Sequence, residues 1–204
     1  MDWGNASDLA SAGCNIVMAS AALYAAVNAK RWFSQKSHTK GFEKAEELLS
    51  QIDHLFSYTN KIHVDLYNVW AYLEKVEKSR GQVDPEKNAY FISLLEELQK
   101  QLDTINRVLL DLKLIERWSI KLKNYTAIAD VLLKLHESIA SCIFLYSYFK
   151  FNIRDVGKYR DSEYELIDNN FKVHYIDASK KTEAVIKPYE KLVNLKFTQL
   201  FAVK

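Results

Sequence analysis

The chain has 204 residues, with 28 Lys and Arg against 26 Asp and Glu, and its net charge of +2 excludes a strong overall preference for polyanionic or polycationic partners. Only five Gly and two Pro occur, and because these residues mark loops, most of the chain is expected to form long helices. The two cysteines, Cys14 and Cys142, are far apart and lack metal-type spacing, which fits a reducing cytosolic body without a disulfide.

The first expected element is an N-terminal membrane-type helix within residues 1–33. Leu9 to Ala29 form a run of 21 residues without a charge, and a helix of that length spans about 31 Å, close to the ~30 Å hydrocarbon thickness of a bilayer. Lys30 and Arg31 follow the run, so the positive-inside rule places residues 34–204 in the cytoplasm. Trp3 and Trp32 flank the run and, with these two charges, are expected to lie at the membrane interfaces.

This segment is rich in small residues, and its Asn and Ser residues oppose insertion unless they find hydrogen-bond partners. Ala21, Ala22, Ala25 and Ala26 have the spacing that allows close helix–helix packing, and Asn15 can hydrogen-bond between helices. The segment is therefore predicted to self-associate in the membrane. An alternative that the residues leave open is an alanine-rich helix buried in a soluble bundle or in a protein interface.

Residues 34–204 are expected to form an antiparallel bundle of about four to five long helices. After a polar stretch at 34–41, apolar residues recur every three or four positions from Phe42 to Val76, which predicts a second helix. The sequence Asp84-Pro85-Glu86 predicts the start of the next helix, because Asp is a good N-cap and Pro is tolerated at the first helical position. Its apolar stripe continues to Trp118.

The C-terminal part of the bundle follows the same helical pattern. Thr126 is expected to cap a fourth helix, in which residues 139–149 lack charge but are too few to span a bilayer. Residues 152–161 are predicted to form a loop, and Pro188 is expected to kink or restart the last helix. The predicted fold class is therefore all-α, with a membrane-type helix followed by a cytoplasmic bundle.

Motifs for catalysis, metal binding and cofactor binding do not occur. The five histidines have no HExxH, ExxH or CxxC neighbours, and the chain has no glycine-rich phosphate loop and no GxSxG motif. Paired acids fall on the outer faces of predicted helices. The protein is therefore expected not to be an enzyme, with no catalytic residue, no metal and no cofactor.

Two basic features remain. Lys113, Arg117 and Lys121 recur every four residues and, with Lys123 nearby, predict a basic face along one helix, for which contact with phosphate is one interpretation. A solvated face paired with nearby acids is the alternative. Residues 180–204 contain six lysines and two acids, which favours anionic lipid or nucleic acid as a weak partner.

The opening of the chain resembles a recurring class of small bacterial proteins with one N-terminal span and a cytoplasmic helical body. The resemblance covers about the first fifty residues: Asp2-Trp3, the small-residue span, residues 29–32 and residues 43–49. The layout is also similar to the membrane effectors of anti-phage systems, including retron-associated effectors, and of toxin–antitoxin systems. This resemblance implies a single-pass protein of the bacterial inner membrane, or a cytoplasmic protein while an inhibitory or sensor partner holds it in a complex.

Three functions are consistent with these features. The first is a non-enzymatic membrane effector or toxin of a bacterial defence system, which forms homo-oligomers and disrupts the inner membrane when its partner releases it. The second is a helical scaffold or adaptor subunit whose N-terminal helix is buried in an oligomeric or partner interface. The third is a nucleic-acid-associated subunit of a larger assembly, which the basic residues suggest.

Overall fold

The computed structural model describes residues 5–79, 83–153 and 161–203, and nearly all of them are helical, which confirms the all-α class. The sequence pattern did not predict two three-residue strands that form a small antiparallel pair. The elements in chain order are α1 (Asn5–Lys78), α2 (Pro85–Leu114), η1 (Ile115–Trp118, a 3-10 helix), β1 (Ile120–Leu122), α3 (Tyr125–Ile153), α4 (Asp161–Glu183), α5 (Ile186–Val193), α6 (Phe197–Leu200) and β2 (Phe201–Val203).

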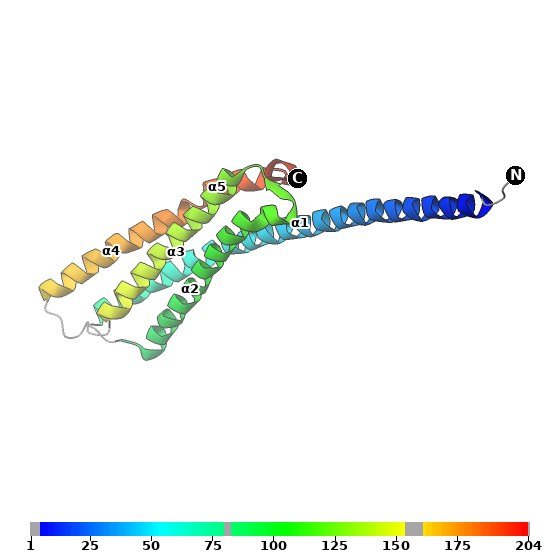
Figure 1. The fold of residues 1–204 in the computed structure, drawn as a ribbon. Coiled ribbons are helices and arrows are strands. Elements are labelled where there is room, and N and C mark those ends of the chain that lie inside the picture. Colours follow the sequence, from blue (N-terminus) through cyan, green and yellow to red (C-terminus); the bar gives the residue numbers. More distant parts are fainter. Residues whose placement is uncertain (1–4, 80–82, 154–160, 204) are drawn as a thin grey trace.

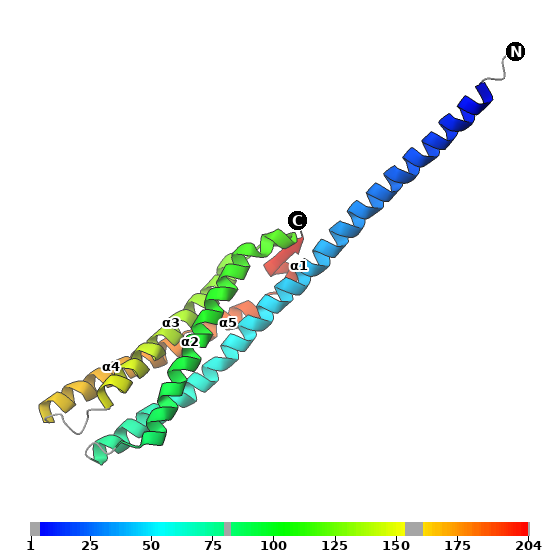
Figure 2. The ribbon, with the colours of Figure 1, turned by 60° about the horizontal axis from the view of Figure 1, so that its bottom comes forward.

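Helix α1 is continuous over 74 residues, about 111 Å at 1.5 Å per residue. Its N-terminal half projects from the rest of the molecule as a single helix (Figure 1, Figure 2). The predicted break at residues 34–41 is wrong, because this stretch contains no proline and its Gln and Lys residues are good helix formers. The expected boundary between residues 33 and 34 thus falls inside one helix, and Gly41 is the first buried residue among those with described side chains.

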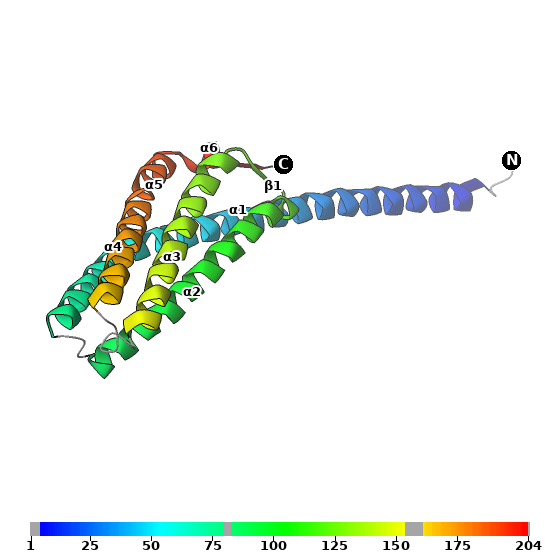
Figure 3. The ribbon, with the colours of Figure 1, turned by 90° about the vertical axis from the view of Figure 1, so that its left-hand side faces the viewer.

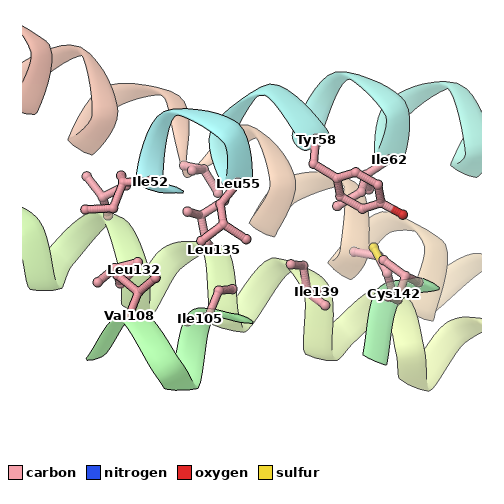
Figure 4. Packing of buried hydrophobic residues seen from close by; sticks show 14 of the residues in the cluster. Ile52, Leu55, Tyr58, Ile62, Ile105, Val108, Leu132, Leu135, Ile139 and Cys142 are labelled. Carbon is pink, nitrogen blue, oxygen red and sulfur yellow. The ribbon is translucent and has the colours of Figure 1, made fainter. Parts of the chain in front are cut away.

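The C-terminal half of α1 forms an antiparallel bundle with α2, α3 and α4 (Figure 3). Helix α3 packs against α2 and α4, and α1 closes the bundle by contacting the same two helices. Ile52, Leu55, Ile105 and Leu135 lie at its centre, each at most 1% exposed (Figure 4). Burial of such side chains stabilises the fold by roughly 25 cal/mol per Å² of apolar surface.

The start of α2 agrees with the sequence pattern. Asp84 is the N-cap, and its Oδ1 accepts hydrogen bonds from the backbone N–H groups of Glu86 at 3.0 Å and Lys87 at 3.3 Å. The hydroxyl of Tyr72 accepts a hydrogen bond from the Asp84 N–H at 2.8 Å, so the end of α1 is fixed to the start of α2.

The later helix boundaries correct one expectation and confirm another. Asn124, not Thr126, caps α3, because its Oδ1 accepts from the Ala127 N–H at 3.2 Å and from the Thr126 hydroxyl at 3.1 Å. Helix α4 ends at Glu183 and α5 restarts with Pro188 in its first turn, as predicted. The predicted loop at 152–161 lies largely outside the described residues. Helix α3 ends at residue 153 and α4 begins at residue 161.

Candidate functional site

The projecting segment, defined as residues 15–40 of α1, carries apolar side chains that the bundle does not cover. Every side chain described in this segment is exposed except that of Asn28, which is half-buried. The exposed fraction is 67% for Ile16, 70% for Leu23 and 72% for Tyr24. Large apolar side chains in such numbers are usually covered in a protein's working state.

Between residues 15 and 29, five of the six exposed large apolar side chains form a stripe, whereas Met18, which is 62% exposed, lies on the other half of the helix. Successive residues of an α-helix turn by about 100°, so Ile16, Leu23 and Val27 fall within roughly 40° of one another. Val17 and Tyr24 widen this stripe on one side. No charged residue occurs around the helix from residue 15 to residue 29.

The small residues predicted to pack between helices occupy the opposite half of the helix. Ala21, Ala22, Ala25 and Ala26 are all exposed there. Because the exposed Met18 lies between Ala25 and Ala22 around the helix, the line of Ala22 and Ala26 is where a partner helix can approach most closely. Asn15 is also exposed and, by the same rotation, lies in line with Ala22 and Ala26. All five predicted packing residues therefore lie on the half of the helix opposite the stripe, spread over about 140°.

The predicted interface residues lie where the uncharged run ends. Lys30, Arg31 and Trp32 are exposed, and Trp32 is 53% exposed. The rings of Trp32 and Phe33 meet edge-on with their centres 5.0 Å apart. The Lys36 Nζ lies 4.8 Å from the centre of the Trp32 ring. Trp3, the other predicted anchor, lies outside the described residues. Over the residues that the structure describes, no helix combines the length and the hydropathy needed to cross a membrane.

A collar, defined as residues 115–123 and 197–203, holds α1 where it leaves the bundle. Strands β1 and β2 pair antiparallel with Lys121 opposite Ala202. Gly41 permits the contact with α1, because a Cβ atom there would lie 2.4 Å from the Trp118 carbonyl oxygen and 2.5 Å from Ile120 Cγ1. Sequence reasoning missed the collar, although a glycine inside a helix costs about 1 kcal/mol relative to alanine and is a signal of close approach.

Aromatic rings complete the collar. Phe42 of α1 lies 5.6 Å from Phe197, which in turn lies 5.0 Å from Phe201, measured between ring centres. Ser119 adopts a left-handed backbone conformation with φ of 61°, which turns the chain from η1 into β1. The C-terminal segment is therefore packed against the point where α1 leaves the bundle.

The basic residues predicted to lie along one helix do not. Helix α2 ends at Leu114, so Lys113 lies in its last turn, Arg117 lies in η1, and Lys121 and Lys123 lie in and just after β1. The reason is the turn at residues 115–119, which breaks the four-residue periodicity. These four side chains are exposed on the same end of the bundle, and Lys123 Nζ donates to the Thr198 carbonyl at 3.0 Å.

The bundle carries no arrangement typical of catalysis within its described residues. No group of three or more His, Cys, Asp or Glu side chains in this part of the chain could hold a metal ion. Burial raises the pKa of the Cys142 thiol to about 12, so this cysteine is not a reactive thiolate. A hollow of about 410 Å³ beside the collar is lined by Lys44, Glu47, Asp111 and Arg117 among others, whose charges offset one another.

Among the described residues, one acidic side chain is buried inside the bundle, together with four Ser and Thr residues. Asp65 is 4% exposed, and its Oδ1 accepts a hydrogen bond from the Tyr90 hydroxyl at 2.9 Å. Burial raises the pKa of Asp65, while the Tyr90 hydrogen bond opposes the shift. No nucleophile or second acid in hydrogen-bond contact with Asp65 is described, so the pair is consistent with a structural role.

Comparison with known proteins identified no similar protein. None of the protein-family models matches the chain, and neither a curated protein nor a solved structure is significantly similar to it.

Proposed function

We propose that the protein is a non-enzymatic membrane effector whose projecting segment inserts into a membrane and associates with the same segment of other copies. The observation that carries this proposal is the exposure of apolar and small side chains all around a helix that leaves the bundle. A helix without a polar face is stable when lipid or protein surrounds it.

Lipid is the surrounding that the charge pattern supports. The uncharged run of 21 residues begins at Leu9, before the first described side chain, and matches the thickness of a bilayer. Helices that pair in water keep charged residues on their outer faces, and this run has none. The basic residues that follow it, Lys30 and Arg31, orient the bundle toward the cytoplasm.

Self-association would offset the polar residues of the span. Ser20 and Asn28 weaken insertion of a single helix, whereas the face with Asn15, Ala22 and Ala26 permits close packing and a hydrogen bond between helices. An assembly of such helices would disrupt the membrane, as in the effectors with a similar layout. The bundle would then bind the inhibitory or sensor partner that controls the assembly.

The test is membrane fractionation of the full chain followed by alkaline carbonate extraction. We expect the full chain to stay in the extracted membrane pellet, and a chain lacking residues 9–29 to appear in the soluble fraction with the same helical circular-dichroism spectrum. Growth and membrane-potential dye uptake measured on the same cells test the disruption of the membrane. A full chain that remains soluble and monomeric without detergent would contradict the proposal.

The second candidate is a scaffold or adaptor subunit whose projecting segment is buried in an oligomeric or partner interface. The observation that favours it is that no described helix meets the requirements of a membrane span. In that case the full chain would form a stable soluble oligomer or complex, visible by light scattering without detergent, and carbonate would release it from membranes.

A further inference from the structure

We infer that the end of the bundle from which α1 leaves is a docking surface for anionic lipid headgroups. This inference rests on the proposed membrane insertion of the projecting segment. It adds which face of the bundle meets the membrane and which lipids that face selects.

The charge of the chain is distributed very unevenly. Three stretches that are far apart in sequence, residues 30–42, 117–129 and 191–204, together contain ten Lys and Arg and no Asp or Glu. The other residues therefore hold 18 of the 28 basic residues and all 26 acidic residues. The net charge of +2 thus conceals a strongly basic part and an acidic remainder.

The fold brings these three stretches together. Residues 117–129 and 191–204 are joined by the pairing of β1 with β2 and by the hydrogen bond from the Lys123 N–H to the Leu200 carbonyl at 2.8 Å. Gly41 and Phe42 bring the third stretch against both of them, through Ile120 and Phe197 respectively. Strand β2 lies beside the point where α1 leaves the bundle (Figure 2). We call this region the basic end.

The basic side chains of this end are available to a ligand. All nine of those with described side chains are exposed. The nearest acids on α1 begin at Glu43, on the bundle side of Gly41, and one of them, Glu47, forms an ion pair with Lys44. Two further acids, Asp111 and Glu116, precede Arg117 in the sequence and lie beside this region. The positive charge is therefore concentrated toward the projecting segment.

Exposed aromatic side chains accompany these charges. Trp118 is 39% exposed and Tyr125 is 44% exposed, and both belong to the second basic stretch. Trp32 and Phe33 are exposed on the first stretch. Trp and Tyr favour the headgroup level of a bilayer, where one part of the ring is apolar and the other is wet. Basic residues mixed with such rings fit a lipid surface better than a solvated helix face.

The geometry of α1 allows this end to reach the membrane. Ala29 and Gly41 are separated by about 18 Å along a continuous helix, and the headgroup layer takes up about 5–7 Å of that distance. An upright helix would hold the part of the basic end around Gly41 roughly 12 Å from the headgroups, which is about one and a half Debye lengths at physiological salt. Tilting of α1 costs little and would bring the basic end into contact.

The experiment uses full chains in which Ile16, Leu23 and Val27 are changed to Gln, which prevents insertion without changing the charge. Co-sedimentation is measured with vesicles of phosphatidylcholine alone or with phosphatidylglycerol. The test variant adds Lys40→Gln, Arg117→Gln and Lys121→Gln at the basic end. Its matched control adds three neutralisations at the opposite end of the bundle, Lys75→Gln, Lys78→Gln and Lys87→Gln, all at exposed positions.

We expect binding only to the vesicles with phosphatidylglycerol, and loss of that binding at high salt. A basic residue near an anionic surface changes the binding constant roughly five-fold, so the test variant should bind about 100-fold more weakly than its parent. The matched control should bind within about three-fold of the parent, because its charges lie about a bundle length from the surface and are screened.

Several results would overturn the inference. They are equal losses in the test variant and the matched control, equal binding to neutral vesicles, and binding to duplex DNA at a salt concentration that abolishes vesicle binding. Circular dichroism must show the same helix content in all chains. The lipid and salt dependence of the parent tests the selectivity for anionic lipid without any variant of the basic end, and equal binding to neutral vesicles refutes it. Insertion is measured separately by carbonate extraction of the chain with native Ile16, Leu23 and Val27, so failure of docking and failure of insertion are distinguishable.

Discussion

Gly41→Ala is expected to loosen the collar, because the collar has no room for a methyl group on α1. The added Cβ would lie 2.4 Å from a backbone oxygen of Trp118, which cannot rotate away, and 2.5 Å from Ile120 Cγ1. Overpacking of this kind costs about 1–3 kcal/mol, and the higher helix propensity of alanine returns up to about 1 kcal/mol. We therefore expect a net destabilisation of about 1–2 kcal/mol and a Tm lowered by about 2–8 °C.

The assay combines urea unfolding with amide hydrogen exchange. The amides of β1 should exchange faster in Gly41→Ala, because displacement of β1 from α1 weakens its pairing with β2. Asn60→Ala is the control, since Asn60 is exposed in the same helix and its substitution raises helix propensity without a new contact. If Gly41→Ala is as stable as Asn60→Ala and β1 keeps its protection, the collar is not seated against α1 as described.

Three further predictions test the bundle and the projecting segment. Burial raises the pKa of Asp65, so the folded protein holds the carboxyl proton more tightly than the unfolded chain does. The stability should therefore fall as the pH rises from the unfolded pKa near ~4 through the raised pKa of the folded state. Asp65→Asn should flatten this part of a plot of urea midpoint against pH, and an unchanged slope would refute the assignment. Asp84→Ala should lower the free energy of unfolding by about 1 kcal/mol, because the Glu86 and Lys87 N–H groups lose their acceptor; no loss would show that water replaces the cap. Ala22→Leu combined with Ala26→Leu should abolish membrane disruption while the protein still resists carbonate extraction, because leucine favours insertion but prevents close approach of the helices. If the double variant still disrupts the membrane at the same abundance, packing through the side of α1 with Ala22 and Ala26 is excluded.

Much of the bundle was predictable because its helices repeat apolar residues every three or four positions. The stripes are buried or partly buried as expected from Ala45 to Val76 and from Phe91 to Ile115, whereas their end residues Phe42, Tyr90 and Trp118 are exposed. Asp84 caps α2 as predicted. The break expected at residues 34–41 did not occur, because polar composition alone does not end a helix. Asn124 replaced Thr126 as the cap of α3, since both residue types can cap a helix and sequence alone does not choose between neighbours two positions apart.

One part of the candidate site follows from local helix geometry, and the other depends on contacts between distant segments. The alignment of Asn15, Ala22 and Ala26 on the projecting segment was predictable, because helical rotation alone brings them together, while their role in packing remains a prediction. The basic end was not, because it depends on the pairing of β1 with β2, two strands of three residues separated by about eighty positions. Strands this short show no periodicity above background. The four-residue spacing of Lys113, Arg117 and Lys121 suggested one helix face, yet the turn at residues 115–119 places them on different elements. The pairing of β1 with β2 and the contacts of Gly41 and Phe42 then bring this region together with residues far away in the sequence. The charge of a surface is thus set by which segments meet there, and for this protein a net charge near zero is compatible with a strongly basic end facing a membrane.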